Sequence, residues 1–278
     1  MPQVERSAAV SALSWQPLGG SGDTVLAMDF AVGRKGAGFE AVAAGLSTSF
    51  AVFLSTFQPG SLESLSTGPT PAAERFTRDI RTSCAGLPPV RAVIGYCAGS
   101  AFACHAADTL ADGGHRPPVV LLDPATATPA TIWERYVEAM NGLKELLPAE
   151  RIDQELARTP QDPAAALPAY AATLAGTYRA LVTEACDLLG AADLAVQLGT
   201  HVADALHYQA VAGAIGGNRR GAVVFTSKGF VPEPPYAPAD VAFDVAYADL
   251  LRDDAVVRAV VDAVSAERGP RSPIGPVA

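Results

Sequence analysis

The sequence predicts an α/β protein with a mostly parallel sheet, flanked by helices and interrupted by a long helical insertion. Short apolar runs such as Val119 to Leu122 alternate with helical segments, as expected for parallel strands that are covered on both faces. Between Thr131 and Gly216 the alternation stops, and only helical patterns follow until Gly221. With 278 residues, of which 49% are hydrophobic, the chain can form one large core that carries an insertion.

Apolar periodicity and turn residues place the individual elements in chain order. Expected strands are Thr24 to Phe30, Phe50 to Thr56, the run that starts at Val90, the run that ends at Leu122, Gly221 to Thr226 and Val241 to Val245. Expected helices are Phe39 to Leu46, Pro71 to Ala85, Ala98 to Leu110, Ile132 to Leu147, Arg151 to Ala157, Leu167 to Leu189, Ala191 to Ile215 and Asp254 to Ala266. We expect residues 1–127 and 219–278 to form the core, and residues 128–218 to form a helical lid over the site.

A cysteine flanked by glycines lies where the strand from Val90 meets the helix from Ala98. Gly95-x-Cys97-x-Gly99 has the spacing of a nucleophile elbow, with cysteine where serine is usual. Glycines are needed there because Cβ atoms would collide in so sharp a turn. The helix N-terminus would point at the sulfur, which predicts a lowered pKa for the Cys97 thiol. The alternative is a glycine-rich turn whose buried cysteine only fills space.

Asp123 ends the next apolar run, 26 residues after Cys97. Functional residues of parallel sheets gather at the carboxyl ends of the strands, where an acid can orient and stabilise a base. We therefore expect Asp123 near Cys97. The alternative is a turn or helix-capping residue before Pro124.

The loop from Val32 to Gly38 is rich in glycine and follows the first expected strand. It is not a phosphate-binding P-loop, because no lysine followed by Ser or Thr comes after its last glycine. A backbone of this composition can approach a substrate oxygen closely. The alternative is a flexible, solvated loop.

Composition excludes several classes of function. The net charge of -9 argues against nucleic acid as a partner, because a phosphate backbone requires a basic face. The four cysteines show no metal-ligand spacing and no C-x-x-C pair, which predicts a reducing compartment and no metal site. His201 and His207 are not spaced as helical metal ligands, and solvated or core histidines are expected there. Without a basic leader or a run of 18 apolar residues, we expect a soluble, cytoplasmic protein with no membrane contact.

The chain resembles the thioesterases of the α/β-hydrolase fold, which release or edit acyl chains in polyketide and nonribosomal peptide biosynthesis, including that of antibiotics. The resemblance rests on the motif from Gly95 to Ser100, on Val119 to Asp123, on the helical insertion and on Tyr247 to Leu251. It implies an α/β-hydrolase fold with a helical lid.

The resemblance also implies roles for individual residues. Cys97 would be the nucleophile, Asp123 the triad acid, and the oxyanion hole would use backbone N–H groups of Ala98 and of Val32 or Gly33. The family's last motif usually reads His-x-x-Leu/Met-Leu, with histidine as the general base. Tyr247 occupies that position here, and all four histidines precede the last strands.

Three functions follow from this incomplete triad. The first is acyl transfer from a carrier-protein thioester through an acyl-Cys97 intermediate, supported by Asp123 and Tyr247, since a cysteine needs no base if its pKa is low. The second is an editing or releasing hydrolase that borrows His201 or His207 as its base. The third is a catalytically silent relative that binds an acyl chain or a carrier protein.

The expected partners are an acyl or peptidyl carrier protein and a small acyl thioester. No cofactor of the protein's own is expected, since the acyl group would arrive on the partner's phosphopantetheine arm. Carrier proteins are acidic, so we expect docking near the basic pairs Arg34-Lys35 and Arg219-Arg220. The alternative is that these side chains are only solvated.

Overall fold

A single seven-stranded sheet organises the structure, a computed structural model that describes residues 11–30, 36–111, 115–161, 165–216, 219–234 and 236–266. Its strand order is β1-β3-β2-β4-β5-β6-β7. The strands are β1 (Leu13–Gly19), β2 (Thr24–Met28), β3 (Ala51–Phe57), β4 (Val90–Tyr96), β5 (Val119–Leu122), β6 (Val223–Thr226) and β7 (Val241–Ala242).

Six of the seven strands run parallel, and only the edge strand β1 pairs antiparallel, with β3. The central strands β2, β4 and β5 are apolar and almost fully buried, as expected where helices cover both faces. This strand order, with a sharp turn directly after β4, is that of the α/β-hydrolase fold. The predicted fold class is therefore confirmed.

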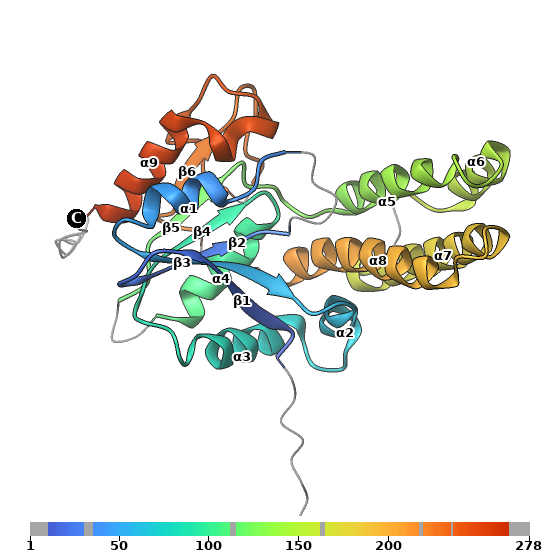
Figure 1. The fold of residues 1–278 in the computed structure, drawn as a ribbon, viewed down its shortest axis with the longest axis horizontal. Helices are drawn as coiled ribbons and strands as arrows, with labels where there is room; N and C mark the ends of the chain where they lie inside the picture. Colours follow the sequence, from blue (N-terminus) through green and yellow to red (C-terminus); the bar gives the residue numbers. More distant parts are fainter. Residues whose placement is uncertain are drawn as a thin grey trace, which may run out of the picture.

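Helices cover both faces of the sheet (Figure 1). On one face α1 and α9 pack over the core that contains Val25, Ile94 and Leu122, and on the other α3 and α4 cover Leu26, Val93 and Leu121. The helices are α1 (Glu40–Leu46), α2 (Ser61–Thr67), α3 (Ala72–Cys84), α4 (Gly99–Thr109), α5 (Pro129–Leu143), α6 (Ala149–Arg158), α7 (Leu167–Leu188), α8 (Ala192–Ile215) and α9 (Asp254–Ser265), with the 3-10 helix η1 (Tyr247–Arg252) before α9.

In its described residues, the insertion between β5 and β6 contains helices joined by loops and no strand, as predicted. Helices α5 to α8 extend away from the sheet as an arm with its own apolar core (Figure 1). The carboxyl-terminal half of α8 joins this arm to the sheet, because Tyr208 stacks between Phe30 and Phe102 with ring centroids 4.7 and 4.5 Å away. The division of the chain into units at residues 128 and 218 stays a prediction.

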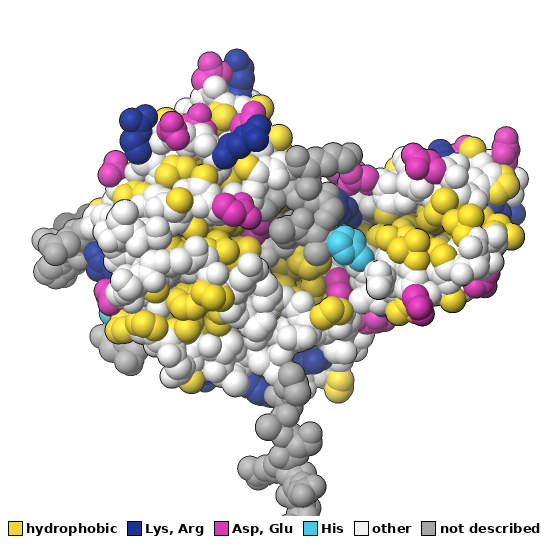
Figure 2. Space-filling model, in the orientation of Figure 1, with side chains coloured by type: hydrophobic (Ala, Val, Ile, Leu, Met, Phe, Trp, Pro, Cys, Tyr) yellow, Lys and Arg dark blue, Asp and Glu magenta, His cyan; other side chains and the backbone are white. Residues whose placement is uncertain are grey.

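Hydrophobic side chains are also exposed on the arm, and hydrophobic surface gathers over it in Figure 2. The large exposed apolar residues there are Leu146, Leu188, Leu189, Leu194 and Val196. Among the described residues, no helix has the length and apolarity that crossing a membrane requires.

The predicted elements differ from the observed ones at β1, α2, β7 and the unpredicted 3-10 helix η1. Strand β1 and helix α2 were not predicted, and the expected strand from Val241 to Val245 pairs only over Val241–Ala242. Strand β1 contains Pro17, which lacks the N–H that a central strand needs and is tolerated at a sheet edge. Its register shifts between Pro17 and Gly19, so its pairing depends on β3 more than on its own pattern.

Candidate active site

The turn after β4 has the geometry of a nucleophile elbow. Cys97 adopts φ 51°, in the left-handed region that a non-glycine residue rarely occupies, and its N–H donates to the Leu122 carbonyl at 3.0 Å. A Cβ at Gly95 would lie 2.6 Å from the Ser100 Cα, and one at Gly99 would lie 2.2 Å from the Met28 carbonyl oxygen. Both contacts are with backbone atoms, so the predicted steric need for two glycines is confirmed.

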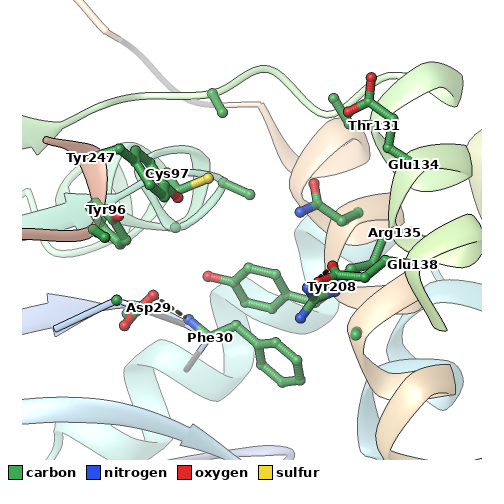
Figure 3. A pocket seen from close by; sticks show the side chains of 17 residues that line it. Asp29, Phe30, Tyr96, Cys97, Thr131, Glu134, Arg135, Glu138, Tyr208 and Tyr247 are labelled. Atoms are coloured by element: carbon green, nitrogen blue, oxygen red, sulfur yellow. Dashed lines mark hydrogen bonds and ion pairs between the residues drawn. The ribbon is translucent and has the colours of Figure 1, made fainter. Parts of the chain in front are cut away.

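Cys97 opens into a pocket of about 440 Å³ between the sheet and the helical arm (Figure 3). The side that we call the elbow wall carries Asp29, Tyr96, Cys97 and Tyr247. The opposite side, the helical wall, carries Thr131, Glu134, Arg135 and Glu138 from α5 and Tyr208 and Gln209 from α8. Cys97 therefore faces a charged surface that comes from the insertion.

The Cys97 thiol is not activated by its position at the helix N-terminus, contrary to the sequence-based expectation. Burial raises its pKa, and the negative charges of Asp29 and Asp123 act in the same direction. Hydrogen bonds from the Tyr247 hydroxyl and the Ala98 N–H lower the pKa but do not outweigh burial. The thiol therefore predominates at neutral pH, and the predicted lowering of the Cys97 pKa is wrong.

Tyr247 lies beside Cys97, as predicted. It begins η1, and its ring stacks on that of Tyr96 with centroids 5.6 Å apart. Burial raises the pKa of the phenol, and a thiolate at Cys97 would raise it further. Tyr247 therefore stays protonated and serves as a hydrogen-bond donor to the sulfur, not as a base.

Asp123 is fully buried directly behind the elbow and does not line the pocket. It has φ 42°, and its Oδ1 accepts a hydrogen bond of 2.8 Å from the Ser227 N–H. Its Oδ2 has no hydrogen-bond partner in the described part of the chain. Burial raises the pKa of this carboxyl group. The charge of Asp123 raises the pKa of both Cys97 and Tyr247. In a catalytic triad, an oxygen such as Oδ2 would accept a hydrogen bond from the histidine.

None of the four histidines, all of which lie in the described residues, lines the pocket. His207 is fully buried near Glu63 and Arg179, and burial lowers its pKa. His201 is exposed on α8, and His105 pairs with Thr77 at 2.8 Å. The proposed borrowing of His201 or His207 as a base therefore has no support from their positions.

The remaining predicted site residues divide into two groups. Val32, Gly33, Arg34 and Lys35 lie outside the described residues, so only the Ala98 N–H of the expected oxyanion hole is placed, beside the Cys97 sulfur. Arg219 is half-buried, with its guanidinium 4.5 Å from the centre of the Tyr236 ring, and Arg220 is exposed. Both arginines come just before β6 and so lie at the amino-terminal ends of the parallel strands, whereas Cys97 lies at the carboxyl-terminal ends.

Sequence reasoning missed Asp29 as a site residue. It directly follows β2, is 5% exposed, and lines the pocket on the same wall as Cys97 (Figure 3). The signal that singled out Asp123, a carboxylate at the end of an apolar strand, was also present here. Within the described residues, no group of three or more His, Cys, Asp and Glu side chains could hold a metal ion.

No protein-family profile matches the chain, and no curated protein matches it. Among solved structures, it is similar to the Vlm2 thioesterase domain bound to a dodecadepsipeptide, with 21% identity, 89% of this chain and 94% of that chain covered, and a TM-score of 0.41. It is also similar to the enol-lactonase of Burkholderia xenovorans LB400, with 15% identity, coverages of 91% and 96%, and a TM-score of 0.47.

A third similar structure is the four-domain nonribosomal peptide synthetase AB3403. The identity is 14%, the TM-score is 0.44, and the match covers 92% of this chain and 20% of that one. At these identities and TM-scores the comparisons carry no argument about function, which rests on the site itself.

Proposed function

We propose that the protein is an acyltransferase that takes an acyl group from a carrier-protein thioester onto Cys97 and passes it to a second acceptor. The observation that carries this proposal is the pairing of an elbow cysteine with a tyrosine where a base would stand. The family resemblance of the elbow motif and of the segment from Tyr247 to Leu251 supports the same chemistry.

The loading step needs no group beyond those of the site. Cys97 releases its proton to solvent water, and the thiolate attacks the thioester carbonyl, whose oxygen is stabilised by the Ala98 N–H. The bond between the carbonyl carbon and the sulfur of the phosphopantetheine arm then breaks. The arm leaves as a thiolate and takes up a proton, so one thioester replaces another and no cofactor is consumed.

Tyr247 favours transfer over hydrolysis. Water needs a base to attack the acyl-Cys97 thioester, and a phenol with a raised pKa cannot act as that base. An incoming thiol or amine is a better nucleophile than water and can attack the thioester without a base from the protein. Because the acyl-Cys97 bond and the carrier thioester are chemically alike, the reaction is reversible and suits passing an acyl group on.

The arm and the surface have proposed roles in this reaction. Helices α5 and α8 supply the helical wall of the pocket, so the arm to which they belong is proposed to act as a lid that sets which acyl groups fit. Docking of the carrier near Arg34, Lys35, Arg219 and Arg220 stays a prediction. Charge reversal at Arg219 and Arg220 tests it, because it should slow transfer from the carrier and leave turnover of a small thioester unchanged.

Intact-protein mass measurement after incubation with an acyl-carrier thioester tests the proposal. We expect a lasting mass gain on the wild type and on Cys84→Ala, which removes the other cysteine that is not fully buried. Cys97→Ala should abolish loading, and Cys97→Ser should be nearly inactive because a hydroxyl group has no comparable ionised fraction. Rapid release of free acid would instead identify the protein as a hydrolase. If neither a mass gain nor free acid is observed, the protein is a catalytically silent binding protein.

A further inference from the structure

The far end of the helical arm concentrates exposed apolar side chains. Of the eight large hydrophobic side chains that are exposed in the described residues, five lie there. These five, which we call the apolar patch, are Leu146, Leu188, Leu189, Leu194 and Val196. Leu188 and Val196 are 73% and 70% exposed. Soluble proteins usually expose such side chains singly, and a group of them marks an interaction site.

The patch forms because the ends of four helices meet at this end of the arm (Figure 1). The turn between α7 and α8 carries four of the five side chains. An ion pair brings the turn between α5 and α6, which carries Leu146, to the same place. Its partners are Arg151 at the start of α6 and Glu184 near the end of α7, with Nη2 and Oε2 3.4 Å apart.

Exposed carboxylates adjoin the patch. Four of them lie within a few residues of its members: Glu145, Glu150, Asp187 and Asp193. None of the four takes part in an ion pair within the described part of the chain. The nearby cations are already paired, Arg151 with Glu184 and Lys144 with Asp153 at 2.7 Å. The patch is therefore apolar with a negatively charged surround.

This charge distribution selects among the possible occupants. A second copy of the chain would bring the same carboxylates face to face, and an acidic carrier protein or an anionic membrane would be repelled in the same way. The described part of the insertion contains no strand, so an added strand would find no edge to pair with. A helix can pack against the ends of α7 and α8, and lysine or arginine beside its apolar stripe would meet the carboxylates.

We propose that the apolar patch docks a basic amphipathic helix of a partner protein. None of its five residues lines the pocket. Along the axis of α8, Leu194 lies about 16 Å from Ala205, the first residue of that helix in the pocket wall. The partner would therefore be held without closing the site, and the inference does not depend on the chemistry at Cys97.

Calorimetry with three synthetic peptides tests the inference. Each has about 18 residues, because shorter isolated helices are marginal in water. The stripe peptide carries leucines along one helical face and lysines beside them, the scrambled peptide has the same composition without a stripe, and the acidic peptide has glutamate in place of lysine. We expect the wild type to bind the stripe peptide at least about 10-fold more tightly than the scrambled one, and the acidic one not measurably.

Two double variants separate the apolar and the charged contributions. Leu188→Ser with Leu189→Ser removes apolar area and should weaken binding of the stripe peptide by about 10-fold or more. Glu145→Gln with Asp187→Asn should weaken it by about 5-fold and reduce its dependence on salt, because rim charges contribute modestly and are screened. All four side chains are exposed, so both variants should fold, which circular dichroism verifies.

A matched control changes the same kinds of side chain elsewhere. Val231 is 79% exposed in the loop after β6, and the exposed Glu233 lies beside it without an ion pair in the described residues. Val231→Ser with Glu233→Gln should bind the stripe peptide as the wild type does. Equal weakening by this control and by the leucine variant would contradict a site on the arm.

Other outcomes overturn the inference in favour of a different occupant. Equal binding of the stripe and scrambled peptides, or full binding by the leucine variant, would mean that no apolar docking takes place. A wild-type dimer in sedimentation that the leucine variant abolishes would assign the patch to a second copy. Flotation of the wild type with phosphatidylcholine vesicles would assign it to a membrane. Loading of Cys97 enters none of these measurements, so failure of the proposed function is detected separately.

Discussion

The two walls of the pocket are built in different ways. The elbow wall consists of strand ends and a single sharp turn, where Cys97 and Gly99 are fixed by backbone contacts to β2 and β5. The helical wall consists of side chains on α5 and α8, of which Glu134 and Glu138 are exposed. Local backbone geometry thus positions Cys97, whereas the packing of a segment distant in the sequence decides which side chains face it. Substitutions in the first wall should disturb folding and chemistry together, and those of the exposed side chains in the second should change mainly the choice of substrate.

The same substitution in the two regions should give opposite results, and its effect on Cys97 loading is the largest that we expect outside Cys97 itself. Gly99→Ala would place a Cβ against the Met28 carbonyl, so the elbow must shift. The variant should lose at least about 100-fold in Cys97 loading and about 1–3 kcal/mol in the free energy of unfolding. Gly142→Ala, at an open position on α5, should stabilise the protein by about 0.5–1 kcal/mol because alanine favours a helix. Mass spectrometry and urea denaturation measure both. Normal loading by Gly99→Ala would mean that the glycine spacing is incidental.

Tyr208 connects the two walls, and removing its ring should cost stability more than chemistry. It stacks between Phe30 and Phe102, so Tyr208→Ala should lower the free energy of unfolding by about 3–5 kcal/mol. Tyr208→Phe keeps the ring and its stack, so it should retain most of this stability. Urea denaturation of both variants checks this. Equal destabilisation by the two would assign the stability to the hydroxyl group instead of the ring.

Tyr247→His should raise hydrolysis relative to transfer, because an imidazole at this position could deprotonate water. The buried Asp123 Oδ2, which has no hydrogen-bond partner in the described chain, offers an acceptor for the imidazole N–H. We expect the ratio of free acid to transferred product to rise by about 10-fold or more, because a well-placed general base usually contributes about 100-fold or more. The double variant Tyr247→His with Asp123→Asn serves as the control and should lose most of the gain. An unchanged ratio in the single variant would indicate that another base already acts.

The sequence predicted the parts of the site that depend on local backbone geometry and missed those that depend on tertiary packing. Spacing located the Gly95-Cys97-Gly99 turn and Asp123 directly after β5, because both depend on short segments. The family resemblance located Tyr247. The charge around Cys97 depends on burial and on residues from other strands, so the predicted lowering of its pKa was wrong. The helical wall could not be predicted, because Glu134 and Gln209 meet only through the packing of α5 on α8.

The insertion gives the same lesson at the level of the fold. Its helices are long enough for apolar periodicity to define them, and the predicted segments from Leu167 to Leu189 and from Ala191 to Ile215 match α7 and α8 to within one residue at each end. Strand β1 contains a proline and pairs only with β3, so its own pattern was too weak to predict it.

The smallest expected effect is a shift in the pH midpoint of Cys97 alkylation. It tests the electrostatic difference between the two walls without a substrate. Alkylation of Cys97 by iodoacetamide requires the thiolate, so its rate rises with pH through the thiol pKa, which burial places above the ordinary value. Asp29→Asn removes a negative charge that opposes the thiolate, so the midpoint should move to lower pH by an amount on the order of one unit. Tyr247→Phe removes a hydrogen bond to the sulfur, so the midpoint should move to higher pH. Glu134→Gln, across the pocket, should leave it nearly unchanged. Peptide mass spectrometry resolves Cys97 from the three other thiols, and a midpoint that ignores Asp29→Asn would mean that this carboxylate does not act on the nucleophile.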